Sequence, residues 1–362
     1  MTDSALEKSS LKKLGEVRRK TLRVSQQALV KAECLQPGRP LPLVIQPAVD
    51  GIDLVSWATR NRELIETQLL RHGGILFRNF AMKSVAEFEQ FMVAVAGELM
   101  AYHDRATPRS QVTGNIYTST EYPAAHSIEL HNESSYASTW PVKICFFCVT
   151  PPLQGGETPL ADTRNVFKRI NPKIRERFIQ QKVRYVRNFG GSVGLPWETV
   201  FQTTERAVME DYCRSAGIEF EWQEGNRLKT QQVRPAVARH PRTGEMVWFN
   251  QATAFHVSTL EPALREALLA ELPEEEVPKN VYYGDGSRIE SAVLDELREA
   301  YRQETVAFPW QEGDLLLLDN LLVAHGRAPF VGPRKIVVGM AEPFHWQDME
   351  RRGAEIQACN RK

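Results

Sequence analysis

The chain has 362 residues, and its 45 lysines and arginines balance its 45 aspartates and glutamates, so composition argues against nucleic acid or an anionic membrane surface as a partner. No stretch reaches the roughly 18 consecutive apolar residues of a membrane span, and the N-terminus lacks the apolar core of a signal peptide. Five cysteines without disulfide spacing favour reduced thiols, and hence a cytoplasmic protein.

Residues 1–36 are predicted to form a basic helical extension, ahead of a main domain at 37–345 and a charged tail at 346–362. Leu11, Leu14 and Val17 begin a loose helical stripe among lysines and arginines. The extension is either a solvated helix or a docking surface for an acidic partner such as a carrier protein. The Pro37-Gly38-Arg39-Pro40 segment then breaks the helix.

The main domain opens with helical periodicity over 57–71, and a glycine turn leads into a short buried strand over 73–80. Ser84, with Glu87 three residues later, is the expected N-cap of a helix through about Ala96. Residues 113–122 are polar and aromatic. Within them, Asn115 either lines a pocket beside the functional site or belongs to a turn.

The segment 128–136 contains His131-Asn132-Glu133. In extended backbone, residues two apart point the same way, so the imidazole of His131 and the carboxylate of Glu133 converge. With a second imidazole they would complete the two-histidine, one-carboxylate facial triad that holds non-haem Fe(II) and leaves three coordination positions open. Alone, the same pair could simply be hydrogen-bonded at the end of a strand.

Residues 143–150 read as a buried strand on which Cys145 and Cys148 face opposite ways, so we interpret them as core residues rather than a redox or zinc pair. Asp162 is expected to cap a helix through roughly Arg177. A strand over 183–189 follows. If Arg187 faces inward there, its guanidinium could hold a substrate carboxylate by two hydrogen bonds.

The mixed region at 190–232 is predicted to be an insertion that forms a lid and sets substrate choice. Strand-like segments at 235–239 and 246–251 flank a hairpin turn. Trp248 and Asn250 share one face of the second strand and either face the substrate or pack in the core. His256 lacks a ligand-type partner two or four residues away, so we exclude it as a metal ligand. Helices are expected over 261–272 and 289–303.

A second histidine follows the apolar run Leu315–Leu318, which reads as a buried strand. This histidine is His325, and a further buried strand over 334–340 comes after it. Arg334 stands at the mouth of that strand, where a cation suits a carboxylate-bearing cosubstrate. Taken singly, His325 could be an ordinary core histidine and Arg334 a surface cap.

The order of these elements predicts a mixed β fold with helical insertions. Strands do not alternate regularly with helices, as a doubly wound fold requires. Short strands with turn signals around long helical insertions instead fit a double-stranded β-helix, the jelly roll. In that fold His131 and Glu133, from an early strand, meet His325, from a late strand, at one open end.

The pairing of His131-x-Glu133 with His325 resembles the TauD/TfdA-like Fe(II)/2-oxoglutarate-dependent dioxygenases. The resemblance extends over about 51–343 and includes Gly155-Gly156-Glu157-Thr158-Pro159-Leu160-Ala161-Asp162, His240-Pro241-x-Thr243-Gly244, Trp310-x-x-Gly313-Asp314 and the run 327–335. Within the family, the chain looks like the branch of nonribosomal peptide pathways in secondary metabolism. Members of that branch hydroxylate amino acids, free or tethered to carrier proteins.

The resemblance implies that His131, Glu133 and His325 are the metal ligands and catalytic centre, with Fe(II), the cosubstrate 2-oxoglutarate and O₂. It also implies that Thr158 hydrogen-bonds the distal carboxylate of 2-oxoglutarate. Many relatives carry the 2-oxoglutarate arginine at the place of Gly339 or Met340, so this chain departs from the pattern. Arg334 is preferred in that role for its planar guanidinium.

Lys335 is the reserve for the 2-oxoglutarate role, because neighbours on a strand point opposite ways. Glu133 itself predicts hydroxylation or desaturation rather than halogenation, since related halogenases replace this carboxylate with a small residue to admit chloride. The alternatives are a zinc hydrolase with the same ligands and a non-catalytic jelly-roll binding module. The expected partner is an amino-acid-type substrate, with a carrier protein as a second possibility; the oligomeric state is left open.

Overall fold

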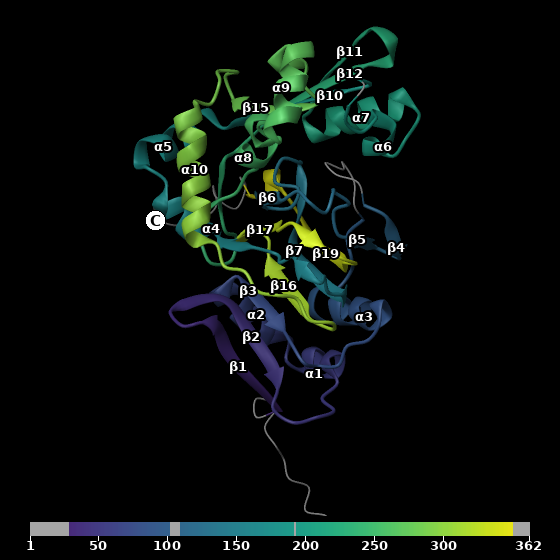
Figure 1. The fold of residues 1–362 in the computed structure, drawn as a ribbon, viewed down its shortest axis with the longest axis vertical. Helices are drawn as coiled ribbons and strands as arrows, with labels where there is room; N and C mark the ends of the chain where they lie inside the picture. Colours follow the sequence, from purple (N-terminus) through teal and green to yellow (C-terminus); the bar gives the residue numbers. More distant parts are fainter. Residues whose placement is uncertain (1–28, 102–108, 192, 350–362) are drawn as a thin grey trace, which may run out of the picture.

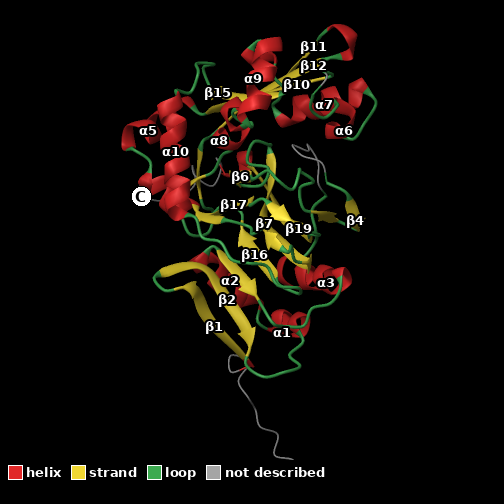
Figure 2. Ribbon diagram, in the orientation of Figure 1, coloured by secondary structure: helices red, strands yellow, loops and turns green. Residues whose placement is uncertain are grey.

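The computed structural model describes residues 29–101, 109–191 and 193–349. Its largest element is an eight-stranded sheet, in the lower half of the ribbon in Figures 1 and 2. In spatial order the strands are β1 (Val30–Gln36), β2 (Arg39–Pro47), β3 (Gly74–Phe77), β16 (Leu315–Asp319), β7 (Thr139–Thr150), β19 (Lys335–His345), β5 (Ile116–Thr118) and β4 (Gln111–Thr113).

A second, smaller layer of strands faces the large sheet. It contains β6 (Ile128–His131), β17 (Val323–Arg327) and β9 (Leu160–Asp162), with the pairs β8 (Gln154–Gly155)–β18 (Phe330–Val331) and β13 (Val237–Arg239)–β14 (Met246–Trp248). One apolar cluster joins the layers: it combines Ile144 and Leu316 from the large sheet with Leu160 and Val323 from the small one. Two packed sheets with helical insertions are the predicted jelly roll.

The apolar run Leu315–Leu318 is explained by cover on both faces of the large sheet. Leu316 and Leu318 pack between the sheets, whereas Leu315 and Leu317 pack on the other face. That face is covered by α1 (Leu54–Arg60), α2 (Arg62–His72) and α3 (Val85–Ala96). Helix α3 begins as predicted, with the Ser84 hydroxyl accepting a hydrogen bond from the Glu87 amide.

The cysteines of β7 divide between the same two faces. Cys145 packs with the helix-covered cluster and Cys148 with the cluster between the sheets, and both are free thiols. The prediction that they are core residues facing opposite ways is therefore confirmed.

A third sheet lies over the open end of the sandwich (Figure 1). Its order is β11 (Glu219–Trp222), β12 (Leu228–Arg234), β10 (Val183–Phe189) and β15 (Lys279–Tyr283). The helices in and around it are α4 (Thr163–Arg169), α5 (Pro172–Gln181), α6 (Trp197–Phe201), α7 (Arg206–Ala216), α8 (Ala252–Phe255), α9 (Pro262–Glu271) and α10 (Ser291–Glu304). The region predicted as a lid, 190–232, thus supplies α6, α7, β11 and β12.

Several predicted elements are wrong in type or extent. The helix expected over 57–71 is two helices, α1 and α2, which meet at Asn61. Residues 30–36 of the expected N-terminal helix form β1, which pairs antiparallel with β2 around a turn where Gly38 has φ +77°. Strand pairing overrides the local periodicity there; residues 1–28 lie outside the described ranges. The predicted helix from Asp162 is two helices, because Pro172 disfavours a helical Asn171 and starts α5 anew. Asp162 does cap the first of them.

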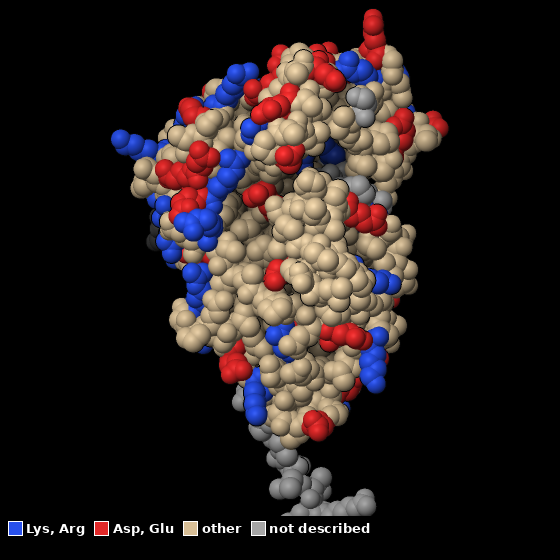
Figure 3. Space-filling model, viewed as in Figure 1, with Lys and Arg blue, Asp and Glu red and all other residues tan. Residues whose placement is uncertain are grey.

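Acidic and basic side chains are interspersed on the face shown in Figure 3, as the balanced composition leads one to expect. The charged tail predicted at 346–362 begins inside the fold, since Trp346 and Met349 belong to the apolar cluster between the sheets. Nowhere in 29–101, 109–191 or 193–349 is a helix long and apolar enough to cross a membrane.

Candidate metal and active site

The two predicted histidines meet across a pair of strands. Strands β6 and β17 are antiparallel, and His325 stands directly opposite His131 in their register. The ring centroids are 4.6 Å apart. With Glu133, two residues beyond His131, they form a cluster whose ligand atoms all lie within 4.8 Å of one another. The fold thus brings together two histidines that are 194 positions apart along the chain, as predicted.

Both imidazoles are placed so that their neutral form, which binds metal ions, is favoured. Nδ1 of His131 lies 2.8 Å from the carbonyl oxygen of Glu129, so it can donate there and leave Nε2 free to bind a metal. Burial lowers the pKa of His131. Burial, followed by the charges of His131 and Arg109, lowers the pKa of His325 well below its ordinary value. Neutral imidazole is the form that ligates metal ions.

Glu133 is held by an asparagine that sequence analysis missed. The Asn320 side chain accepts a hydrogen bond from the Glu133 amide at 2.7 Å and donates to the Glu133 and Pro141 carbonyls, each at 2.9 Å. Its own carbonyl oxygen accepts from the Asn132 side chain at 2.6 Å. Asn320 directly follows the apolar strand β16, and this position was the signal available in the sequence; its side chain is fully buried in the structure.

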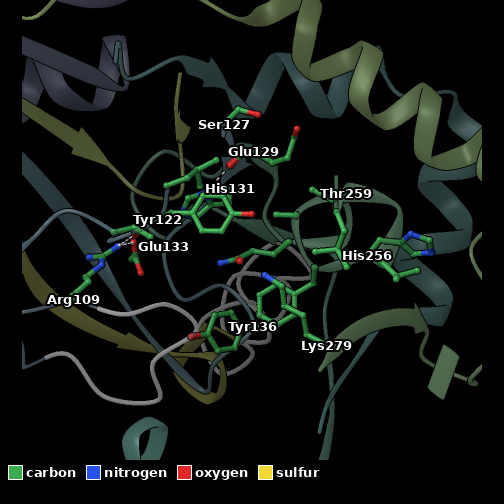
Figure 4. A pocket seen from close by; sticks show the side chains of 17 residues that line it. Arg109, Tyr122, Ser127, Glu129, His131, Glu133, Tyr136, His256, Thr259 and Lys279 are labelled. Carbon is green, nitrogen blue, oxygen red and sulfur yellow. Dashed lines mark hydrogen bonds and ion pairs between the residues drawn. The ribbon is translucent and has the colours of Figure 1, made fainter. Parts of the chain in front are cut away.

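Arg109 is the second residue that the sequence did not reveal. Its guanidinium lies 2.6 Å from Oε2 of Glu133, and both side chains are buried. The same carboxylate oxygen is 3.8 Å from Nε2 of His325. Figure 4 shows Arg109 and Glu133 joined at one side of the cavity. An arginine 24 residues upstream carries no local pattern that links it to Glu133.

This donor set fits a ferrous ion. Two imidazoles and one carboxylate on one side of an ion form the facial triad of non-haem iron oxygenases. Nε2 of His325 faces Glu133, and Nδ1 of His325 is buried without a hydrogen-bond partner among the described residues. Bonds of about 2 Å to a shared ion require only small shifts from the observed separations.

A small cavity adjoins the triad on the side of β17. It is lined by both histidines and by Thr158, Arg327 and Arg334 among others. Arg334 donates from Nε to the Gly156 carbonyl at 3.0 Å and from Nη1 to Ser119 at 3.3 Å. Burial, followed by the charge of Arg327, lowers the pKa of Arg334 to about 10, so it stays cationic at neutral pH. The reserve candidate, Lys335, is exposed.

Thr158 and Arg327 also line the small cavity. Thr158 is buried, and its hydroxyl accepts a hydrogen bond from the Trp310 indole at 3.2 Å. Arg327, which sequence analysis did not single out, donates to the carbonyls of Tyr122, Pro123 and His126. It thereby fixes the 122–126 segment against β17. Many relatives carry their 2-oxoglutarate-binding arginine at the position of Gly339 or Met340. In this chain Met340 is a core residue, buried between the sheets.

Two glycines bring the β8–β18 pair close to this cavity. Gly155 has φ +66°, and a Cβ there would lie 2.2 Å from the Pro329 carbonyl oxygen. A Cβ on Gly156, with φ +70°, would lie 3.1 Å from Cδ of Arg334. Only glycine permits this approach, and the Gly156 carbonyl then anchors Arg334.

A larger cavity, of about 180 Å³, opens on the other side of the triad (Figure 4). Arg109, His131 and Glu133 line one part of it. Aromatic and apolar residues line the middle, and Lys279 of β15 lies in the opposite part with His256. His131 and Arg109 face both cavities, so the candidate metal site lies between them.

The four predicted substrate residues lie outside this lining. Asn115 donates to the Leu99 carbonyl at the β4–β5 turn, which is the turn role weighed for it. Trp248 packs edge-on against Phe178, and Asn250 donates to the Ala236 carbonyl. The interpretation of Trp248 and Asn250 as substrate-facing was wrong, because that face of β14 is core; the next residue, Gln251, lines the cavity instead.

Arg187 comes nearer to the cavity. It is buried on β10, with its guanidinium carbon 5.8 Å from the centroid of the Tyr136 ring, and Tyr136 lines the cavity. In the register of β10 and β15 it stands opposite Lys279. Arg187 thus lies behind the cavity wall, whereas Lys279 lies in it.

The fold is a jelly roll, and it carries two histidines and a glutamate between two cavities. This combination is typical of the non-haem iron oxygenases. The sequence model of the family described as "Taurine catabolism dioxygenase TauD, TfdA family" matches residues 37–340. The chain belongs to this family, and it is an Fe(II)/2-oxoglutarate-dependent dioxygenase with Fe(II), 2-oxoglutarate and O₂ as its cofactors and cosubstrates.

Two curated relatives are similar over most of their length. The dapdiamide synthesis protein DdaC of Enterobacter agglomerans is 38% identical over 312 residues, which cover 83% of this chain and 95% of the relative. A clavaminate synthase-like protein of Arabidopsis thaliana is 27% identical over 322 residues, covering 84% and 94%.

Solved structures support the fold. PvcB of Pseudomonas aeruginosa is 17% identical, with a TM-score of 0.53 over 86% of this chain and 91% of PvcB. AAD-2, solved with Mn(II) and N-oxalylglycine, is 11% identical, with a TM-score of 0.51 over 86% and 96%. At these identities the likeness concerns the fold alone.

Proposed function

We propose that His131, Glu133 and His325 bind the ferrous ion of this dioxygenase, and that it hydroxylates an unactivated C–H bond of an amino-acid-type substrate in the larger cavity. The observation that carries the proposal is the convergence of the three donor groups between two cavities. When bound, the iron couples oxidative decarboxylation of 2-oxoglutarate to oxidation of the substrate carbon.

The smaller cavity is proposed to receive 2-oxoglutarate. Arg334 supplies a cation that stays charged at neutral pH, and Thr158 supplies a hydroxyl, for the distal carboxylate. Guanidinium binds carboxylate through two parallel hydrogen bonds, which fixes orientation as well as affinity. Arg109 keeps the Glu133 carboxylate oriented, and Asn320 keeps its backbone in place. Such support holds ligand geometry before the cosubstrate arrives.

The larger cavity is proposed to receive the substrate, and the 190–232 insertion, which contributes β11 and β12 to the third sheet, is proposed to act as a lid. An amino-acid-type substrate of secondary metabolism is supported by the relative named for dapdiamide synthesis. The substrate is free or presented by a carrier protein. The retained Glu133 carboxylate favours hydroxylation or desaturation over halogenation. Cys34, Cys145, Cys148 and Cys213 are free thiols, which supports a cytoplasmic enzyme.

The test is succinate formation by purified protein with Fe(II), 2-oxoglutarate, O₂ and a panel of L-amino acids. We expect hydroxylated product in step with succinate, and loss of both in Glu133→Ala. Glu176→Ala, an exposed glutamate on α5, is the matched control. Turnover that survives exclusion of iron and O₂ would instead indicate the zinc hydrolase. Ligand binding without succinate would indicate a binding module, and a chlorinated product in chloride would contradict the role given to Glu133.

A further inference from the structure

Lys279 is a lysine in the wall of the larger cavity. It is the first residue of β15 and is partly buried. Its Nζ lies 4.9 Å from the centroid of the Phe255 ring. Within the described part of the chain, Lys279 has no hydrogen-bond or ion-pair partner. A long cationic side chain that reaches an apolar wall in this way usually finds an anion or water.

Three of the other polar groups that line the cavity are already engaged. Arg109 is paired with Glu133, and the Gln251 amide donates to the Asn132 carbonyl at 2.8 Å. Nδ1 of His256 accepts from the Ser258 amide at 3.0 Å. Of the two cations in the lining, Arg109 and Lys279, it is therefore Lys279 whose bonding capacity remains open to an anionic ligand; the one other charged group there without an ion pair among the described residues is the exposed carboxylate of Glu129.

A second cation stands beside Lys279. Arg187 occupies the opposite position in the β10–β15 register. Burial, followed by the charge of Arg187, lowers the pKa of Lys279 to about 8. A cation in a partly buried place attracts an anion, which would offset the desolvation of Lys279.

We propose that Lys279 binds a carboxylate of the substrate and so fixes how far the oxidised carbon lies from that carboxylate. The inference rests on the proposed function and names its substrate class: an anionic amino-acid-type molecule held between Lys279 and the triad. Tyr136, Phe255 and Val257 line the space between and suit an aliphatic chain. The carboxylate is either the α-carboxylate of a free amino acid or a side-chain carboxylate of an aminoacyl thioester.

The experiment compares matched acids and amides. Wild type and Lys279→Met are assayed for succinate with free L-amino acids and their α-carboxamides. They are also assayed with the N-acetylcysteamine thioesters of L-glutamate and L-glutamine. A charged hydrogen bond is worth enough that we expect the wild-type KM for the preferred acid to rise about 10- to 100-fold in Lys279→Met. The KM for the matching amide and for 2-oxoglutarate should stay unchanged.

Two further variants separate charge from structure. Lys279→Arg should keep part of the preference for the acid, because it restores the cation. Lys173→Met, an exposed lysine on α5, should behave as wild type. Preference for the free acid over its amide would identify the α-carboxylate, and preference for the glutamyl over the glutaminyl thioester would identify the side-chain carboxylate.

The outcomes also distinguish the two proposals. If wild type makes succinate but Lys279→Met keeps the wild-type ratio of acid to amide, the inference about Lys279 is overturned and the proposed function stands. If wild type makes no succinate with any probe in the presence of Fe(II), 2-oxoglutarate and O₂, both are overturned.

Discussion

At the scale of single residues, the site depends on how polar groups are held in a poorly solvated place. Each histidine is neutral because burial lowers its pKa, and the glutamate is oriented by a buried arginine and by an asparagine. Removing one partner of such a pair lowers the free energy of unfolding by more than the net contribution of the contact, because the other partner stays buried and unpaired.

Asn320→Ala should weaken metal binding, although Asn320 is not itself a metal ligand. The substitution removes the hydrogen bonds to the Glu133 amide and carbonyl, so the carboxylate loses its fixed position. We expect Mn(II) affinity to fall about 10- to 100-fold and the free energy of unfolding to fall by about 1–3 kcal/mol. Calorimetric titration and urea unfolding measure the two effects. Unchanged Mn(II) affinity in a destabilised variant would mean that Asn320 serves the fold alone.

Arg334→Met and Lys335→Met form a second test. Arg334 lines the small cavity and Lys335 is exposed, so only the first variant should raise the KM for 2-oxoglutarate. Loss of a charged hydrogen bond predicts a rise of about tenfold or more. The same rise in Lys335→Met, with Arg334→Met unaffected, would reverse the assignment.

The lowered pKa of Lys279 predicts a pH profile. Because the pKa lies at about 8 instead of its usual 10.5, the side chain is cationic below pH 8 and loses its charge above it. For an acidic substrate, kcat/KM should therefore fall as pH rises through about 8, since this ratio reports the free enzyme. Burial lowers the pKa of His256, which lines the same cavity, to about 4, so His256 does not change charge in this range. Persistence of the fall in Lys279→Met would assign it to another group.

At the scale of elements, the strands that carry the ligands were predictable and their supports were not. The two-residue spacing predicted that His131 and Glu133 lie together, and they do, although β6 ends at His131 and Glu133 stands in the turn that follows. The run Leu315–Leu318 predicted a buried strand, and this strand is covered on both faces. Arg109 and Lys279 reach the site only through tertiary packing, so no local pattern marks them. The face of β14 was misjudged because alternation says which residues share a side, not which side meets the cavity.

The β8–β18 pair offers a test at this scale. Gly155→Ala would place a Cβ against the Pro329 carbonyl, whereas Gly38→Ala, also at positive φ, meets nothing within 4 Å. Both variants should lose about 1 kcal/mol or more of stability from backbone strain. Only Gly155→Ala should also raise the KM for 2-oxoglutarate, because the pair positions the Gly156 carbonyl that anchors Arg334. An equal effect of both variants on that KM would contradict the role of the pair.

At the scale of the whole molecule, the sandwich joins remote parts of the chain at one metal site, with the third sheet over it (Figure 1). A ligand that binds only the folded state adds stability in proportion to its concentration. Mn(II) at 100 times its dissociation constant should therefore add about 2.7 kcal/mol. Thermal unfolding with and without Mn(II) measures this gain. It should disappear in His325→Ala, and its persistence there would place the bound metal elsewhere.

The most direct test is the position of the metal itself. Crystals grown anaerobically with Fe(II) and N-oxalylglycine, measured at the iron absorption edge, give an anomalous peak at each bound iron. We predict one peak about 2.0–2.2 Å from nitrogens of His131 and His325 and from an oxygen of Glu133. A peak elsewhere, or iron bound while Glu133 contacts Arg109 alone, would contradict the account.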